Sequence, residues 1–149
     1  MTDVSTSIDA TTSLSESPSD ICKLVLVSKT DDVIVVSIPG TDYRLHLRPS
    51  VPASSIAAQE GKRIRGRVRG RALRIHGAAA GGRFIEPIYG HPRIVQGTVA
   101  VVDDRLNRLL VDMVIPVWLD LAEGQRATEF SVGQTVNMYV ESGMIFVPA

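Results

Sequence analysis

The chain has 149 residues, of which 44% are hydrophobic and 21% charged, and its 16 Lys and Arg are balanced by 16 Asp and Glu. Such a chain can form one domain or two very small ones around a buried core, and its single cysteine, Cys22, excludes a disulfide within the chain. No apolar run approaches the roughly 18 residues that span a bilayer, so we expect a cytoplasmic protein with no membrane contact.

The first twenty residues contain ten Ser or Thr, four acids, no base and no aromatic side chain. A composition this polar cannot offset the entropy lost on ordering the chain, which predicts a disordered tail over residues 1–20. The alternative is that the tail adds an edge strand to a sheet. Its net charge of −4 contrasts with +8 over residues 21–83 and −4 over residues 84–149, so charge is segregated along the chain.

Short strands dominate residues 21–80. The segments CKLVLVSK (22–29), VIVVSI (33–38) and YRLHL (43–47) are rich in β-branched residues and are separated by Asp, Gly and Pro. The one helical signal is SSIAAQEG (54–61), in which a serine can cap a turn or two of helix before the glycine ends it. We therefore predict a basic, OB-like small barrel over residues 21–80.

The strongest charge feature is KRIRGRVRGRALRIH (62–76), which holds seven of the sixteen Lys and Arg. Its pattern predicts a hairpin with a strand over 63–68, a turn at 69–71 and a return strand over 72–76. The alternation turns Ile64 and Val68 inward and places on the outer face Arg63, Arg65 and Arg67. Gly66 leaves a gap on the inner side, which is typical of a bend or bulge.

The segment GGRFIEPIYGHPR (81–93) connects the two halves and mixes functional side chains with proline and glycine. Residues of this kind on a stiff connector can line a binding cleft. The candidate residues of such a site are Arg83, Glu86, Tyr89, His91 and Arg93. The alternative, which we favour, is a packed linker whose apolar residues join one half to the other.

Residues 94–149 repeat the pattern of the first half. Shifting the sequence by 72 places residues 45–76 on residues 117–148 without a gap, and it aligns Leu47 with Leu119 and Val68 with Val140. We favour a duplication, which predicts an acidic OB-like barrel over 94–149. The predicted fold is therefore all-β, with two tandem OB-like small β-barrels of about five strands each after the tail.

The second half also resembles a known family. Its opening, QGTVAVV (96–102), has the pattern G-x-V-x-x-V, GQTV (133–136) gives a G-x-x-V strand near the end, and an apolar strand closes it. This order is similar to the molybdate-binding Mop and TOBE class of OB-type barrels. The Ser-Ala-Arg-Asn opening and the Lys-Ala-Ser/Thr turn of the molybdate-binding members have no counterpart here. The resemblance thus implies a fold and carries no ligand site onto a numbered residue.

Residues that usually carry catalysis or bind metals are sparse. The chain has three His and one Cys, with no C-x-x-C or H-x-x-x-H spacing, and Cys22 opens an apolar strand as a buried thiol does. The pairs Asp31-Asp32 and Asp103-Asp104 lie between strands, where Asp favours turns. The glycines of GAAAGGRF (77–84) lack the G-K-[ST] of a phosphate loop. We expect no enzyme, no metal and no cofactor.

Six arginines are the candidate residues for binding an anion or a partner: Arg63, Arg65, Arg67, Arg69, Arg71 and Arg74. Alternate residues of a strand lie about 7 Å apart, which is of the order of the phosphate spacing along a nucleic-acid strand. Against single-strand binding, residues 21–83 contain Tyr43 as their only aromatic side chain. The acidic second half offers carboxylates as a different partner, in the same chain or in the next.

We therefore expect a non-catalytic binding and assembly module, which forms a homo-oligomer or binds a protein partner through charge-complementary surfaces. The alternative is nucleic-acid or polyanion binding through the strand that carries Arg63, Arg65 and Arg67.

Overall fold

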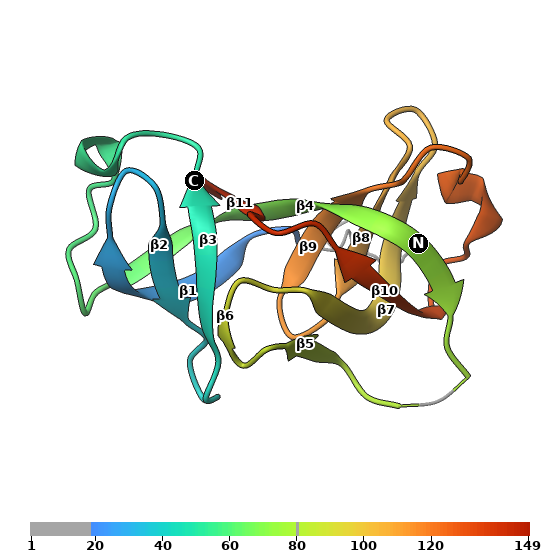
Figure 1. The fold of residues 1–149 in the computed structure, drawn as a ribbon, viewed down its shortest axis with the longest axis horizontal. Coiled ribbons are helices and arrows are strands. Elements are labelled where there is room, and N and C mark those ends of the chain that lie inside the picture. The colour runs from blue at the N-terminus through green and yellow to red at the C-terminus, as the bar shows by residue number, and fades with distance from the viewer. Residues whose placement is uncertain (1–18, 80) are drawn as a thin grey trace, which may run out of the picture.

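One long strand organises the fold. The computed structural model describes residues 19–79 and 81–149, so the predicted tail lies outside the described residues except for Ser19 and Asp20. Strand β4 (Arg63–Gly77) has 15 residues and runs across the molecule, from one group of strands to the other (Figure 1). Its pairing partners determine how the two halves are joined.

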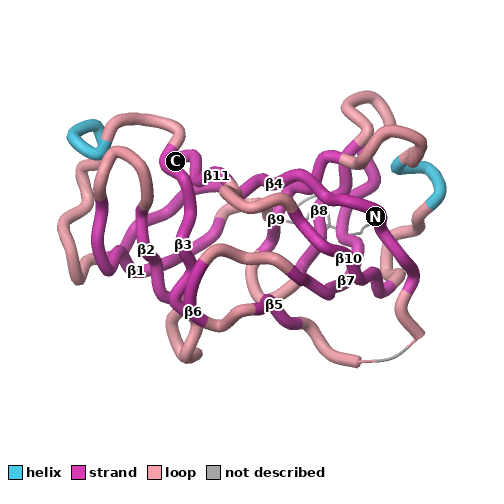
Figure 2. Tube along the Cα trace, viewed as in Figure 1, coloured by secondary structure: helices cyan, strands magenta, loops and turns pink. Residues whose placement is uncertain are grey.

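The described residues form eleven strands and two short helices (Figure 2). The first half contains β1 (Cys22–Lys29), β2 (Ile34–Ser37), β3 (Arg44–Pro49), the 3₁₀ helix η2 (Ala53–Ser55) and β4. The connector contains β5 (Phe84–Glu86) and β6 (Tyr89–Gly90). The second half contains β7 (Ile94–Asp103), β8 (Arg108–Asp112), β9 (Pro116–Asp120), η3 (Ala127–Glu129), β10 (Thr135–Val140) and β11 (Ile145–Pro148). Over these residues no helix has the length and apolar character that a membrane span requires.

Backbone hydrogen bonds join the strands into one mixed sheet. Strands β1, β2 and β3 form an antiparallel meander at one end, and β7, β8 and β9 form another at the opposite end (Figure 1). The last strands of the two halves are exchanged, because β11 pairs in parallel with β3 and β4 pairs in parallel with β9. Strand β4 also pairs with β1, β10 and β11, so both ends of the sheet meet on it.

The all-β prediction is confirmed, but two tandem barrels are not what the sheet shows. Both β4 and β11 are hydrogen-bonded to strands of each half, and the described strands form a single sheet. The order of elements is the same in both halves: three strands, a 3₁₀ helix, and then the exchanged segment. The duplication itself stays a prediction from the sequence.

The predicted hairpin over residues 63–76 is wrong. The strand continues through Gly70, whereas the aligned second-half segment breaks between β10 and β11, where Gly143 has a φ of 89°. Around Gly70, β4 is hydrogen-bonded to β11 on one side and to β9 on the other. A turn at this point would leave those backbone groups without partners in the middle of the sheet.

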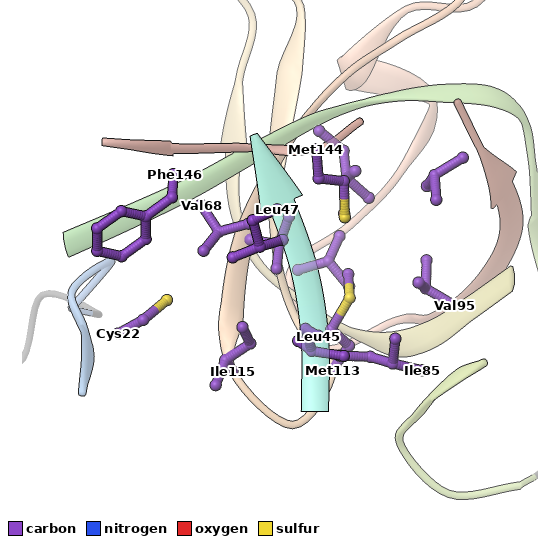
Figure 3. Packing of buried hydrophobic residues seen from close by; sticks show 14 of the residues in the cluster. Cys22, Leu45, Leu47, Val68, Ile85, Val95, Met113, Ile115, Met144 and Phe146 are labelled. Atoms are coloured by element: carbon purple, nitrogen blue, oxygen red, sulfur yellow. The ribbon is translucent and has the colours of Figure 1, made fainter. Parts of the chain in front are cut away.

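The gap beside Gly66 is filled by a side chain from the far end of the sequence. The ring of Phe146 in β11 is fully buried, and a Cβ atom on Gly66 would lie 2.5 Å from its Cζ atom. Figure 3 shows Phe146 in the core with Val68 and Met144. The pairings of β4 with β1 and with β11 both end at Gly66 and neither has a register shift, so the predicted bulge is absent from both.

Candidate anion-binding face

Five arginines form a row on the outer side of β4, which we call the arginine face: Arg63, Arg65, Arg67, Arg69 and Arg71. All five side chains are exposed, while the residues between them face the core, as the sequence predicted for Ile64 and Val68. Successive side chains of a strand point to opposite faces, so the row spans about 27 Å at about 7 Å per alternate residue. Arg74 is exposed too, but it lies within an irregularity in the pairing with β10 and outside the alternation.

The strands beside β4 add side chains to this face. Arg69 is in register with Trp118 of β9 and with Ile145 of β11, because β4 lies between these two strands. Arg65 is in register with Lys23 of β1. Directly paired residues project from the same face of a sheet. The sequence analysis missed Trp118 because this residue lies in the other half, although its outward position in the alternating strand PVWLD was the available signal.

The Trp118 side chain is contacted by two charged residues, Asp20 and Arg108. Its indole Nε1 donates a hydrogen bond to Oδ2 of Asp20 over 2.8 Å, and Arg67 Nε donates to the same oxygen over 2.9 Å. The guanidinium of Arg108 lies 3.8 Å from the centre of the Trp118 ring, a cation–π contact. Burial acts to raise the pKa of Asp20, but the hydrogen bonds from Trp118 and Arg67 and the charge of Arg67 outweigh it, so the pKa lies below the ordinary range.

Three of the eight carboxylates of the second half form ion pairs with arginines that lie outside the arginine face. Asp103 pairs with Arg108, Asp104 with Arg126 and Asp112 with Arg83, at distances of 3.1, 2.8 and 3.1 Å respectively. On the arginine face, Arg71 lies 3.7 Å from Glu141 in an exposed pair, and Arg67 binds Asp20. Within the described residues, the side chains of the face that have no carboxylate partner are those of Arg63, Arg65 and Arg69.

A hollow of about 490 Å³ lies at one end of the arginine face, beside the turn between β10 and β11. Arg48, Arg69 and Arg71 line it together with the hydroxyl-bearing Ser142. Asp120 and Glu141 line it as well, so three guanidinium groups face two carboxylates. Guanidinium groups bind the oxygens of phosphates and carboxylates in pairs of hydrogen bonds, and this hollow can accept one such anionic group.

The connector residues do not form one site. Arg83 pairs with Asp112 of β8, whereas Tyr89 and His91 pack their rings against His46 of β3, with centroids 5.5 and 5.4 Å from it. The remaining two, Glu86 and Arg93, line a shallow hollow beside Tyr139. Strand β6 adds to the edge of β3 and β5 adds to β7, so the connector covers both halves of the sheet as a packed linker would.

The described residues offer little for other chemistry. No group of three or more His, Cys, Asp or Glu within them could hold a metal ion. The thiol of Cys22 is buried and donates to the carbonyl oxygen of Pro116 over 3.2 Å. Burial raises its pKa to about 12, so it stays protonated at neutral pH and is a poor nucleophile.

The sequence matches no family model, and comparison with curated proteins and with solved structures found no match to the chain.

Proposed function

We propose that this protein binds the phosphate backbone of single-stranded nucleic acid along the arginine face. The observation that carries this is the row of five exposed arginines on β4, three of which have no carboxylate partner within the described residues. Phosphate contacts by Arg supply most of the affinity of sequence-independent binding. A row of about 27 Å matches a short extended run of a single strand better than it matches a globular anion.

Trp118 supports the choice of a nucleic acid over a simple polyanion. Proteins that bind single strands combine a positive track with aromatic side chains, and residues 21–83 contain Tyr43 as their only aromatic. In the fold, Trp118 stands in register with Arg69 on the same face of the sheet. Because Arg108 already lies against this ring, we assign most of the binding affinity to the phosphate contacts and a smaller share to stacking on the indole.

Assembly through charge-complementary surfaces, which the sequence analysis put first, has less support. It requires a free acidic surface, and four of the eight carboxylates of the second half already form ion pairs within the chain, which reduces that surface. A homo-oligomer or a protein partner that binds the arginine face remains an outcome of the same experiment.

For the fold, we infer that each half is an OB-type unit completed by the exchanged segment of the other half. The support is the meander of three strands in each half and the return of both meanders to β4, through β1 in the first half and β9 in the second. Strand-lined surfaces of OB-type units commonly bind oligonucleotides, and β4 with its neighbours offers such a surface.

The test compares two triple variants of equal charge. In the first, Arg63, Arg65 and Arg69 are replaced by Gln. In the control, Arg83, Arg105 and Arg126 are replaced by Gln, all of them exposed and none on β4 or on a strand paired with it. Binding of labelled, mixed-sequence single-stranded DNA and RNA is followed by fluorescence anisotropy over a range of salt. We expect the first variant alone to lose affinity for every sequence. Its slope of log K against log salt should fall by about 2, because each lost contact to a single strand removes about 0.7.

Two results would contradict this function. If the wild type does not bind either nucleic acid at low salt, phosphate binding is excluded. If the first variant keeps its nucleic-acid affinity but shifts toward a smaller species in analytical ultracentrifugation, the face is a protein-assembly surface instead.

A further inference from the structure

The described chain enters the fold beside the arginine face. Asp20 already occupies that face, since one carboxylate oxygen accepts hydrogen bonds from both Arg67 and Trp118. The next residue, Ile21, lines a hollow of about 800 Å³. The floor of this hollow is apolar and includes Ile38 and Ile115.

The rim of this hollow is basic. Lys23, Arg63 and Arg65 line it, and none of the three has a carboxylate partner within the described residues. Lys23 and Arg65 are directly paired across β1 and β4, so their charges lie on one face. The hollow is therefore an apolar groove with a positive edge, continuous with the arginine face.

The segment that precedes Ser19 has the complementary chemistry. Residues 1–18 carry Asp3, Asp9 and Glu16 and no Lys or Arg, and their apolar side chains include Leu14. Eighteen residues extend to as much as about 60 Å, about twice the length of the arginine row. The segment can therefore reach every arginine of the face from its attachment at Ser19.

We propose that the acidic segment 1–18 is the occupant of this groove and of the adjoining arginine face, where it competes with nucleic acid within the same molecule. Asp20 then is the anchored end of a longer contact in which Asp9 and Glu16 meet the unpaired cations of the rim. A tethered ligand is present at a high effective concentration, so contacts that are individually weak in water become competitive. This inference rests on the proposed function, because it takes nucleic acid as the ligand with which the segment competes. The contact of the segment with the arginine face can be measured without any nucleic acid.

The binding test uses three proteins: the full chain, a chain that starts at Ser19, and a full-length variant with Asp3→Asn, Asp9→Asn and Glu16→Gln. We expect the shortened chain to bind single-stranded DNA about tenfold more tightly at low salt, because a face that is covered nine-tenths of the time shows one tenth of its intrinsic affinity. The neutral variant should behave like the shortened chain. The difference should disappear at high salt, where exposed charge pairs are screened. Equal affinities of all three proteins at low salt would overturn the competition.

The contact itself is tested by NMR on the Nε–Hε groups of the arginines, without nucleic acid. Between the full and the shortened chain, the signals of Arg63 and Arg65 should shift. The signal of Arg126, which pairs with Asp104 away from β4, should not. Unchanged signals of Arg63 and Arg65 would show that the segment does not dock, whatever the binding data give. If these signals shift but no protein binds nucleic acid, the proposed function has failed and the docking of the segment has not.

Discussion

The strongest test of the fold concerns the two glycines on the inner side of β4. A Cβ atom at Gly66 would press on the backbone oxygen of Val147 and would lie 2.5 Å from Cζ of the buried Phe146 ring. Ordinary contacts begin near 3.4 Å, so β11 would have to move by about 1 Å and would weaken its pairing with β4. Overpacking costs about 1–3 kcal/mol and each weakened backbone hydrogen bond about 1 kcal/mol more. We therefore expect Gly66→Ala to lower the free energy of unfolding by about 3 kcal/mol.

Gly70→Ala is the matched control on the same strand. Its Cβ would lie 2.9 Å from Cγ of the buried Met144, an unbranched side chain that adjusts more readily than the backbone oxygen and ring beside Gly66. The small cost is offset by the gain of about 0.4–1 kcal/mol from restricting the unfolded chain. We expect a change within about 1 kcal/mol. Urea denaturation followed by the fluorescence of Trp118, the one tryptophan, and by circular dichroism measures both variants. A Gly66→Ala variant as stable as Gly70→Ala would refute the packing of Phe146 across β4.

Three further predictions concern other contacts. The Asp20 carboxylate stabilises the fold fully above about pH 4, where it is ionised in both the folded and the unfolded chain, and this contribution is lost as the pH falls through its lowered folded-state pKa. The fluorescence of Trp118 should report the loss as a step in the pH titration. Asp20→Asn should abolish that step. The buried Gln125 side chain forms two hydrogen bonds with the backbone of Ile75, at 2.8 and 3.0 Å, so Gln125→Ala should lower the free energy of unfolding by about 2–4 kcal/mol in urea denaturation. As a control, Gln59→Ala at an exposed position should change it very little. Equal effects of the two variants would contradict this role of Gln125. Because β4 is hydrogen-bonded to strands of both halves, residues 84–149 alone should show no cooperative unfolding transition in circular dichroism. For the same reason Val68→Asp, which places a carboxylate in the core, should unfold the full chain rather than one half.

Much of the local structure follows from the sequence because it depends on short-range periodicity. The alternation over residues 63–68 predicted an inward Ile64 and Val68, and the structure confirms it. It likewise predicted that the outer face carries Arg63, Arg65 and Arg67, and all three are exposed. The positions of most strands follow in the same way from runs of β-branched residues between Asp, Gly and Pro.

Tertiary structure alone decided where the last strand of each half goes. The same aligned segment continues as one strand at Gly70 and breaks at Gly143, because only the former lies between two hydrogen-bonded neighbours, β9 and β11. The composition of the candidate site was decided in the same way. Trp118 reaches the arginines because β9 pairs with β4 of the other half, and Asp20 reaches them through the indole and guanidinium groups that this pairing brings together. Strand pairing between distant segments depends on which backbone groups and core side chains each can satisfy, and no local pattern in the sequence records that choice.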